Sequence, residues 1–402
     1  MRSLHLDPVM DEVRGSGGIA RVQYPYGDAA WLVTGYEDVR TVYSQKAFSR
    51  TGMSQESAPR LTAGLLLQGG IGSLDDSIHT KLRRVIGREL TPARMAALRA
   101  AAAAIMTRRL AELAAAEQGD YVSVVAKPYS LNVLGELVGI AEGDQQDVGE
   151  WVSALLADAS VADAGARSAE TALQDLGKYV LGLIKARRTT PTGDFVSDLV
   201  LHGDDLEKWE LVTVVFALIV GGYESSAHML SKIVLRLLLS PDLRAELRVH
   251  PDRIPGAVDE LLRTIALAGG EGLPWRVREP ISLGGVDMMP GDFVVPSIGA
   301  ANLDPTVYAD PERVDPTRNA KPHMAFGYGA RYCLGNQIAR TELEVAIGML
   351  LRDYPDARLA VEPEQVRWHD GSAVWQLAEL PVALGAPSYA DEAILEVNGG
   401  VM

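Results

Sequence analysis

The feature that most constrains the fold of this chain is a helical pattern that runs from Leu206 to Ser240 and meets Pro241. With a rise of about 1.5 Å per residue, a helix over this stretch would be about 50 Å long. Pro241 ends the pattern because proline lacks an amide hydrogen and its ring clashes with the preceding turn. We therefore expect one long helix that crosses the whole domain.

Shorter patterns surround this helix. Runs such as Trp31–Thr34 predict a small sheet within residues 1–60, Gly- and Pro-punctuated strands are expected at 273–297, and 302–329 reads as irregular. Further segments have the apolar spacing of helices, namely 87–116, 128–139, 145–159, 168–187, 254–266 and 336–354. Neither a repeat nor a flexible linker divides the sequence. We predict a mainly α fold with small β-sheets, a single domain over residues 1–386 and a tail at 387–402.

The charge balance excludes one class of partner. The chain of 402 residues has 38 Lys and Arg against 53 Asp and Glu, and its net charge of -15 argues against a general nucleic-acid binder. Met1–Asp7 lacks the basic and apolar regions of a signal peptide, and the longest strongly apolar stretch, Leu211–Val220, is well short of the roughly 20 residues that span a bilayer. We expect a cytoplasmic protein that binds neither nucleic acid nor membrane.

The sequence has one cysteine, Cys333, which cannot form an internal disulfide or a multi-cysteine metal site by itself. It lies in the run Phe326-Gly-Tyr-Gly-Ala-Arg-Tyr-Cys-Leu-Gly335, directly before a helical pattern. The glycines permit tight turns, and the start of a helix would aim free amides at the sulfur and stabilise a thiolate, the form that ligates iron. A lone cysteine is more often a small apolar core residue, but this loop favours a ligand.

This loop resembles the signature of the cytochrome P-450 family, the heme-thiolate monooxygenases, in which Phe, Gly, Gly, a basic residue, Cys and Gly have the same spacing. The resemblance implies that Cys333 is the axial iron ligand of heme b and that Phe326 and Gly335 belong to the proximal loop. Arg331 stands where bacterial members usually have His. As a cation it would pair with a heme propionate.

A second motif, Glu260-Leu-Leu-Arg263, places an acid and a base at i and i+3 of one helix. Such pairs are common on solvated helix faces, but its position before Cys333 matches the ExxR motif of the family. There the pair joins a third basic residue that holds the heme scaffold. The resemblance gives this structural role to Arg313, with Arg318 as the less favoured choice.

A third motif, Gly221-Gly-Tyr-Glu-Ser-Ser226, lies near the middle of the long helix, where each glycine costs about 1 kcal/mol relative to alanine. A crossing of two helices at small residues would account for the glycines equally well. In the family the matching segment reads Ala/Gly-Gly-x-acid-alcohol. The resemblance implies that Gly221 and Gly222 lie against the heme and that Glu224 and Ser225 are the catalytic pair that relays protons, with Ser225 in place of the usual threonine.

Two further segments concern the heme propionates. The resemblance implies that His79 and Arg83, one helical turn apart, bind them. Counting back from Glu279, the family's usual propionate-binding arginine falls on Trp275, with Arg276 one place later. Because adjacent strand residues point to opposite faces, Arg276 serves only if the register slips or a bulge re-aims it, and Trp275 would otherwise pack on the heme edge or narrow the substrate pocket.

The resemblance covers nearly the whole chain, up to a closing hairpin at 368–381. It implies one heme-thiolate fold with the long central helix crossing over the heme, and a monooxygenase that hydroxylates or epoxidises a medium-sized, mostly apolar small molecule in bacterial secondary metabolism. The pocket walls would come from 61–74, 268–273, 372–374 and the long helix. A loop carboxylate such as Glu271 is more often simply solvated, and the other interpretation is that it receives a cationic group of the substrate. Two alternatives stay open: oxidative ring closure or coupling without oxygen insertion, and a non-catalytic heme-thiolate binder or sensor.

The electrons would come from partner proteins, since no flavin or pyridine-nucleotide domain is left over in 402 residues. We expect a ferredoxin and a ferredoxin reductase as donors, and a monomeric enzyme. A basic face for an acidic carrier would be formed by Lys81, Arg83, Arg84, Arg88 and Arg340.

Overall fold

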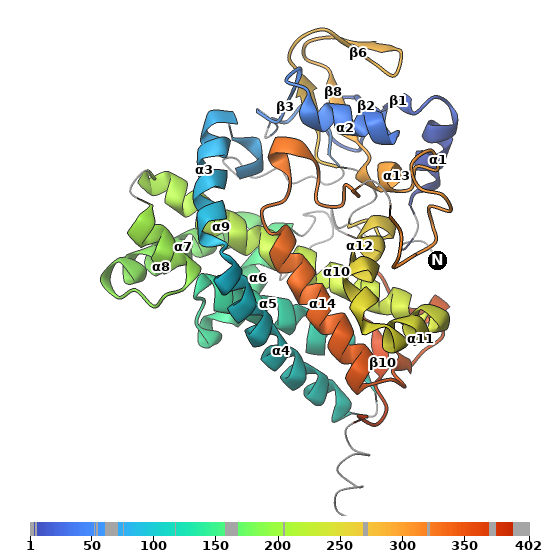
Figure 1. Cartoon of the computed structure of the whole chain (residues 1–402). Helices are drawn as coiled ribbons and strands as arrows, with labels where there is room; N and C mark the ends of the chain where they lie inside the picture. Colours follow the sequence, from blue (N-terminus) through green and yellow to red (C-terminus); the bar gives the residue numbers. More distant parts are fainter. Residues whose placement is uncertain are drawn as a thin grey trace, which may run out of the picture.

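Figure 1 shows the computed structural model of the chain, with a helical region in the lower part of the view and a smaller region built on a sheet in the upper part. The structure describes residues 4, 6–51, 53, 55–60, 71–74, 76–116, 118–156, 168–203, 206–267, 272–319, 322–369 and 375–388. From residue 389 on, the predicted tail lies outside this part of the chain.

Helices supply the larger part of the regular structure. They are α1 Pro8–Gly15, α2 Tyr36–Ser44, α3 Asp76–Glu89, α4 Pro92–Ala114, α5 Lys127–Val138, α6 Gln145–Leu156, α7 Ala169–Thr189, α8 Phe195–His202, α9 Lys208–Gly222, α10 Glu224–Leu238, α11 Pro241–Val249, α12 Ile254–Thr264, α13 Ile298–Asn302 and α14 Asn336–Asp353. The helices predicted around 128–139, 145–159, 168–187, 254–266 and 336–354 are confirmed. The stretch 87–116 divides between α3 and α4, because Thr91 caps the new helix and Pro92 opens it.

The long central helix is present, but it is broken once. It consists of α9 and α10, which meet at Tyr223, and α10 ends shortly before Pro241, the first residue of α11. The prediction of one uninterrupted helix from Leu206 to Ser240 was therefore wrong, because the helix is broken near its middle. The prediction that it ends before Pro241 is confirmed. The break follows the paired glycines, which weaken a helix.

The two halves of this helix are apolar because they lie in the core. By length and composition alone, Lys208–Leu238 could cross a membrane. In the structure, however, half of its most apolar window is buried, and α10 contacts both α5 and α14. A helix that is apolar on most sides is typical of the centre of a large domain.

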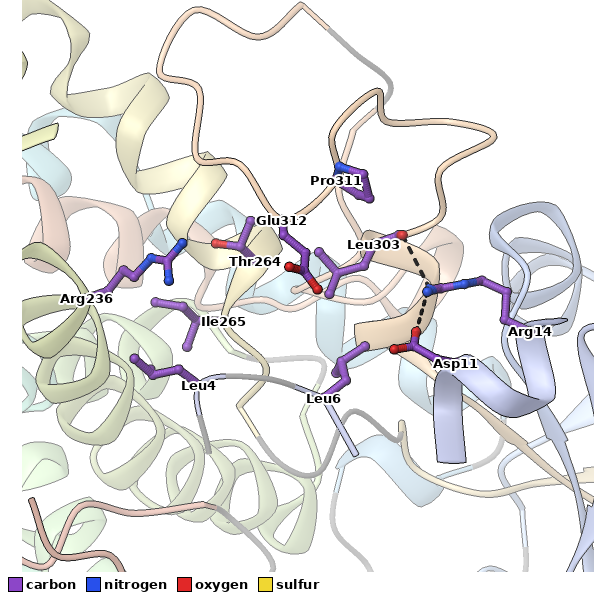
Figure 2. A pocket seen from close by; sticks show the side chains of 10 residues that line it. All are labelled: Leu4, Leu6, Asp11, Arg14, Arg236, Thr264, Ile265, Leu303, Pro311 and Glu312. Carbon is purple, nitrogen blue, oxygen red and sulfur yellow. Dashed lines mark hydrogen bonds and ion pairs between the residues drawn. The ribbon is translucent and has the colours of Figure 1, made fainter. Parts of the chain in front are cut away.

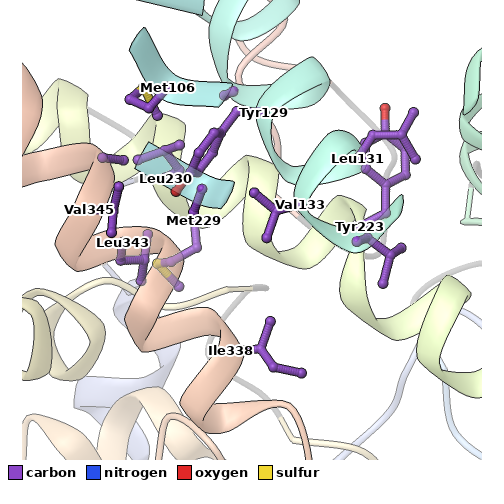
Figure 3. Close-up of a cluster of buried hydrophobic side chains, with 14 of the residues drawn as sticks. Met106, Tyr129, Leu131, Val133, Tyr223, Met229, Leu230, Ile338, Leu343 and Val345 are labelled. Carbon is purple, nitrogen blue, oxygen red and sulfur yellow. The ribbon is translucent and has the colours of Figure 1, made fainter. Parts of the chain in front are cut away.

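Side chains from several helices meet in one large hydrophobic core, part of which is drawn in Figure 3. Met106 of α4, Tyr129 of α5, Leu230 of α10 and Leu343 of α14 are all buried there. Burying such side chains stabilises the fold by about 1.5–3 kcal/mol each. This packing fixes α14, and with it the Cys333 loop that leads into the helix.

The main sheet has five strands in the order β1, β2, β8, β5, β3. They are β1 Ile19–Val22, β2 Ala30–Val33, β8 Phe293–Pro296, β5 Trp275–Val277 and β3 Phe48–Ser49. Only the β2–β8 pair is parallel. Val33, Tyr36 of α2 and Trp275 belong to one buried cluster on this sheet. The predicted small sheet and the strands at 273–297 are confirmed.

Two smaller sheets complete the fold. One is the hairpin of β6 Ile281–Leu283 and β7 Val286–Met288, and the other joins β4 Gly119–Asp120, β10 Pro381–Ala383 and β9 Arg358–Leu359. A bridge between Trp368 and Leu377 confirms the closing hairpin in its described part. Between α13 and α14 the described chain holds neither an α-helix nor a strand, so the irregular stretch at 302–329 is also confirmed.

Candidate active site

Cys333 lies in a loop that closes on itself just before α14. Its amide donates to the carbonyl of Phe326 at 2.8 Å. Gly327 and Gly329 have φ angles of 74° and 65°, the left-handed region that glycine adopts without strain. The helix begins at Asn336, whose side-chain amide donates to the Cys333 carbonyl at 2.7 Å. The loop therefore presents the sulfur at the start of a helix, as the sequence predicts.

The pKa of the Cys333 thiol is subject to opposing effects. The side chain is exposed, but the loop surrounds the sulfur closely. Removal from water raises its pKa, and this exceeds the lowering by the Gly335 amide and by the charges of Arg83 and Arg340. The free thiol thus keeps its proton at neutral pH. An iron that takes this ligand must displace the proton, and the amide and the two cations then stabilise the thiolate.

Phe326 is held at the base of this loop by a cation and a second ring. The Arg340 guanidinium lies 4.6 Å from the centre of the Phe326 ring, and the Tyr332 ring packs edge-on at 6.1 Å. Nε of Arg340 also donates to Asp259 at 2.9 Å. Arg340 therefore supports the loop and is not a free surface cation.

The predicted propionate-binding cations converge beside the loop. Arg83 of α3 donates to the carbonyl of Tyr332 at 2.5 Å, and the guanidinium of Arg331 donates to Asp76 at 2.9 Å. His79, one turn before Arg83 on α3, is buried. The structure therefore brings His79, Arg83 and Arg331 together from two distant parts of the sequence.

This cation cluster has the electrostatics of a site for carboxylates. Burial, followed by the charges of Arg331 and Arg83, lowers the pKa of His79 to about 4. His79 is therefore neutral at neutral pH, while Arg83 and Arg331 carry positive charge that an anion arriving beside them would balance. The two propionates of a heme fit this need, because each brings one carboxylate.

Arg276 is not part of this cluster, and its predicted role is corrected. The pairing of β5 with β3 and β8 runs in regular register, Ser49 opposite Arg276 and Trp275 opposite Val294, with no bulge in these described strands. The alternation of the strand buries Trp275 and exposes Arg276. Trp275 packs against Tyr43, with ring centres 5.3 Å apart.

The two glycines before the helix break have different surroundings. A Cβ atom at Gly221 would meet nothing within 4 Å, and the residue is exposed although it lies in a central helix. A Cβ atom at Gly222 would lie 3.1 Å from a methyl group of Leu134 in α5. Gly221 therefore borders open space, while Gly222 serves the close crossing of two helices, which corrects its assignment to the cofactor.

The pair predicted to relay protons, Glu224 and Ser225, lies at the start of α10. The Ser225 hydroxyl donates to the Gly221 carbonyl at 2.6 Å, which competes with the backbone ladder at the break. Glu224, in contrast, is buried, and its carboxylate is bonded to Ser153, to His228 Nε2 at 3.2 Å and to Gln376 Nε2 at 3.3 Å. Acid and alcohol are neighbours in the chain, but their side chains have separate partners in the described structure.

These partners keep Glu224 ionised. Burial raises the pKa of its carboxyl, but hydrogen bonds from His228 and Ser153 and the charge of His228 leave it lowered. Sequence analysis missed Ser153 and Gln376, which come from α6 and the closing hairpin and carry no local signal. His228 follows Glu224 by four residues on one helix, so helical spacing could have found it.

The acid of the ExxR motif forms a buried network. Glu260 accepts from Arg263 Nε at 2.7 Å and from Arg318 Nε at 2.8 Å, and the amide of Asp315 donates to it at 3.0 Å. Arg313 gives only its carbonyl, to Arg263 at 3.1 Å, while its side chain is exposed. The third basic residue is therefore Arg318, and the preference for Arg313 was wrong.

Comparison with known proteins identifies the family. A family model for cytochrome P-450 matches residues 166–365. Mycinamicin IV hydroxylase/epoxidase from Micromonospora griseorubida is 36% identical over 375 residues, which are 92% of this chain and 94% of that protein. The chain belongs to the cytochrome P-450 family. It is a P-450 monooxygenase, whose cofactor is a heme bound through a cysteine thiolate.

Other relatives agree with this assignment. Nocardicin C N-oxygenase from Nocardia uniformis subsp. tsuyamanensis is 36% identical over 384 residues, 94% of this P-450 and 96% of that protein. Among solved structures, the LnmA cytochrome P-450 hydroxylase from the leinamycin biosynthetic pathway of Streptomyces atroolivaceus S-140 matches with a TM-score of 0.87 and 36% identity, over 95% of this chain and 97% of that one. The mainly α fold with small sheets is thus confirmed as the P-450 fold.

The donor set of the P-450 fits a heme. Cys333 is the single cysteine of the sequence, so it alone can supply the thiolate. Among the described residues, no group of three or more His, Cys, Asp or Glu side chains could hold a metal ion. A single thiolate needs a macrocycle to complete the ligands of iron, and a heme brings both that macrocycle and the carboxylates for the cation cluster.

Two cavities lie away from the Cys333 loop. One of about 100 Å³, drawn in Figure 2, has Leu4, Leu6 and Arg14 from the N-terminal segment around it, and Arg14 donates there to the carbonyl of Leu303 at 3.3 Å. The other, of about 760 Å³, is bordered by α4, α5, α6 and Tyr223. Ser153, the partner of Glu224, lines this second cavity, so Glu224 lies one side chain away from it.

Most of the predicted substrate walls lie outside the described residues. This applies to 61–70, to 268–271 with Glu271, and to 372–374. Of the described walls, Leu218 is partly buried and packs on the core, and Gly221 faces open space. The chemistry of the substrate is therefore a matter of proposal.

Proposed function

We propose that this P-450 inserts one oxygen atom of dioxygen into a medium-sized, mostly apolar small molecule of bacterial secondary metabolism, as a hydroxylase or an epoxidase. The observation that carries the proposal is the break between α9 and α10. There Gly221 borders open space, while Glu224 is kept ionised in a buried hydrogen-bonded group. A binder or sensor has no use for a buried carboxylate beside such a gap. The hydroxylase and epoxidase relative supports the same reaction class.

Each residue of the proposed site has one task. The heme, once bound through the Cys333 thiolate, supplies the activation of dioxygen. The Cys333 loop holds the sulfur at a helix start beside Arg83 and Arg340, which favours the thiolate. Glu224, which is ionised in its buried position, would take up a proton and pass it on, and Ser225 places a hydroxyl at the helix break. His79, Arg83 and Arg331 receive the carboxylates of the cofactor.

Two measurements test this function. The reduced protein with carbon monoxide should show the red-shifted band of thiolate ligation, and Cys333→Ser should lose that band. With a substrate found by its optical shift, product formed under ¹⁸O₂ should carry one labelled atom. A product without label would instead support oxidative coupling, and a parent protein without the red-shifted band would contradict heme-thiolate chemistry.

We further propose that a ferredoxin and its reductase supply the electrons. Arg84 and Arg88 on α3 are exposed, and neither has an ion pair with a described residue. Lys81 is paired with Glu210 at 2.6 Å and Arg340 with Asp259, so these two contribute less to a docking face than the sequence suggested. The free cations on α3 would attract an acidic carrier despite the net charge of -15.

Charge reversal tests this docking face. Arg88→Glu should raise the ferredoxin concentration needed for half-maximal reduction several-fold and flatten its dependence on salt. Arg108→Glu, which makes the same change on exposed α4, is the control. Equal effects of the two substitutions would contradict the proposal. The monomeric state and the cytoplasmic location remain proposals, which gel filtration and cell fractionation would test.

A further inference from the structure

Arg50 is a buried cation that the site described so far does not use. It follows β3, and because Ser49 lies opposite Arg276, the next residue along each strand places Arg50 opposite Trp275. Only 5% of Arg50 is exposed. Its Nε has no hydrogen-bond partner, and its charged neighbours in the described structure are Tyr43 and Arg331, neither of them a carboxylate.

Trp275 forms the surface on which this cation rests. The guanidinium carbon of Arg50 lies 5.8 Å from the Trp275 ring centre, and that of Arg331 lies 6.0 Å from it. Tyr43 packs edge-on against the same ring. The indole Nε1 of Trp275 is buried without a hydrogen-bond partner in the described structure. Two unused donors, one charged and one neutral, therefore occupy one small region.

A buried guanidinium needs an anion. Burial, the charge of Tyr43 and the charge of Arg331 act on Arg50, and together they lower its pKa to about 10, which still leaves the side chain charged at neutral pH. Keeping such a charge away from water without an acceptor is costly, and the neighbouring Arg331 adds repulsion. A carboxylate-like ligand beside Arg50 would remove both costs.

We propose that Arg50, stacked on Trp275, binds one propionate of the heme, and that Trp275 Nε1 is a second donor to it. This inference rests on the heme-thiolate function. It solves the difficulty of Arg276, which faces the wrong side of β5. The guanidinium that the resemblance places at position 275 stands instead on the paired strand, directly across the sheet. An arginine on the neighbouring strand thus takes the role that the resemblance gives to position 275, in exchange for the one that is missing there.

The geometry explains why the exchange preserves the site. Residues that lie opposite each other in an antiparallel pair have Cβ atoms about 4.5–5.5 Å apart and point to the same face. A long, flexible arginine side chain covers that distance easily. Trp275 then fills the space that an arginine stem would take and aligns the guanidinium by stacking.

Heme retention by the holoenzyme tests the proposal. We would measure transfer of heme to excess apomyoglobin for the parent and for Arg50→Leu, with Arg276→Leu as a control on the neighbouring strand. Arg50→Leu should lose heme about tenfold faster or more, since a charge-assisted hydrogen bond is lost. Arg276→Leu should match the parent. Equal rates for Arg50→Leu and the parent, or for the two variants, would overturn the assignment.

A double variant and a spectrum strengthen the test. Arg50→Ser with Trp275→Arg should return heme retention to within about threefold of the parent, because it restores the guanidinium on β5. Resonance Raman spectra of Arg50→Lys should show shifted propionate vibrations, which also covers the case that Arg50→Leu does not fold. Unshifted vibrations, or no rescue, would overturn the proposal. The carbon monoxide band is a separate readout, so loss of that band in the parent would identify a failure of the function itself.

Discussion

Two groups of buried arginines in this P-450 differ in one respect, which is where their acceptors come from. Around Glu260, both Arg263 and Arg318 end on the carboxylate and on backbone carbonyls, so each guanidinium brings its acceptors from the chain. Beside Trp275, Arg50 has an unpartnered Nε and no carboxylate among its described neighbours. Arg50 therefore lacks, within the described structure, the acceptors that the arginines around Glu260 receive from the chain.

The largest expected effect comes from removing the shared acceptor of the first group. Glu260→Ala leaves the buried Arg263 and the half-buried Arg318 without their carboxylate and should cost about 3–5 kcal/mol of unfolding free energy. Urea unfolding of the holoprotein, followed by the heme absorption band, measures this loss. A variant as stable as the parent would show that the network is held by the carbonyl acceptors alone, and the contrast between the two groups would disappear.

A smaller loss should follow when one donor of that group is removed. Arg318→Ala breaks one ion pair with Glu260 but leaves Arg263 in place, so we expect a loss of about 2 kcal/mol. The same urea experiment checks it. Retention of heme at low denaturant should stay near that of the parent, in contrast to Arg50→Leu, because Arg318 serves the scaffold and not the propionates.

Lys232 is a third kind of buried cation, because its described acceptors are backbone carbonyls and not a carboxylate. Its Nζ donates to the carbonyls of Ala266 at 2.6 Å and Leu267 at 3.0 Å. Burial lowers its pKa to about 7, below the 10.5 of an exposed lysine. Between these values the unfolded chain binds more protons than the folded one, so unfolding free energy rises with pH. From pH 7 to 9 we expect the parent to gain about 1–2 kcal/mol over Lys232→Met, in urea titrations at each pH. Parallel pH profiles would contradict the lowered pKa.

The smallest effect should come from Arg313, the residue that sequence reasoning preferred. Its side chain is exposed and only its backbone carbonyl takes part in the network, so Arg313→Ala should change unfolding free energy by less than about 0.5 kcal/mol. Thermal unfolding of Arg313→Ala and Arg318→Ala, measured side by side, gives the difference in stability between the two variants. A loss as large as that of Arg318→Ala would restore the original assignment.

The parts of this structure that follow a local pattern could be predicted from the sequence. The spacing of apolar residues gave the bounds of α12 and α14 within about two residues, and the glycines around Cys333 indicated the tight loop. What the sequence could not show depends on contacts between distant segments. Arg318 and Arg313 are five residues apart in an irregular stretch, and only the path of the backbone decides which side chain turns toward Glu260.

The candidate site shows the same limit. His79 and Arg331 could be proposed from the sequence because each belongs to a motif. Arg50 belongs to no motif, and its proposed role depends on the strand that pairs with it. The predicted role of Arg276 was wrong because adjacent strand residues point to opposite faces. Trp275 points to the inner face, so Arg276 points to solvent. Strand register, which is a property of pairing and not of one segment, decides between them.

The anchoring of Glu224 has a consequence for how this enzyme can evolve. Its carboxylate is tied to Ser153, 71 residues earlier in α6, and to Gln376, 152 residues later in the closing hairpin. Three segments that are far apart in the sequence therefore fix the position of one buried carboxylate. A mutation that shifts α6 or the closing hairpin would therefore also displace Glu224, so the position of this carboxylate evolves together with two segments that lie far from it in the sequence.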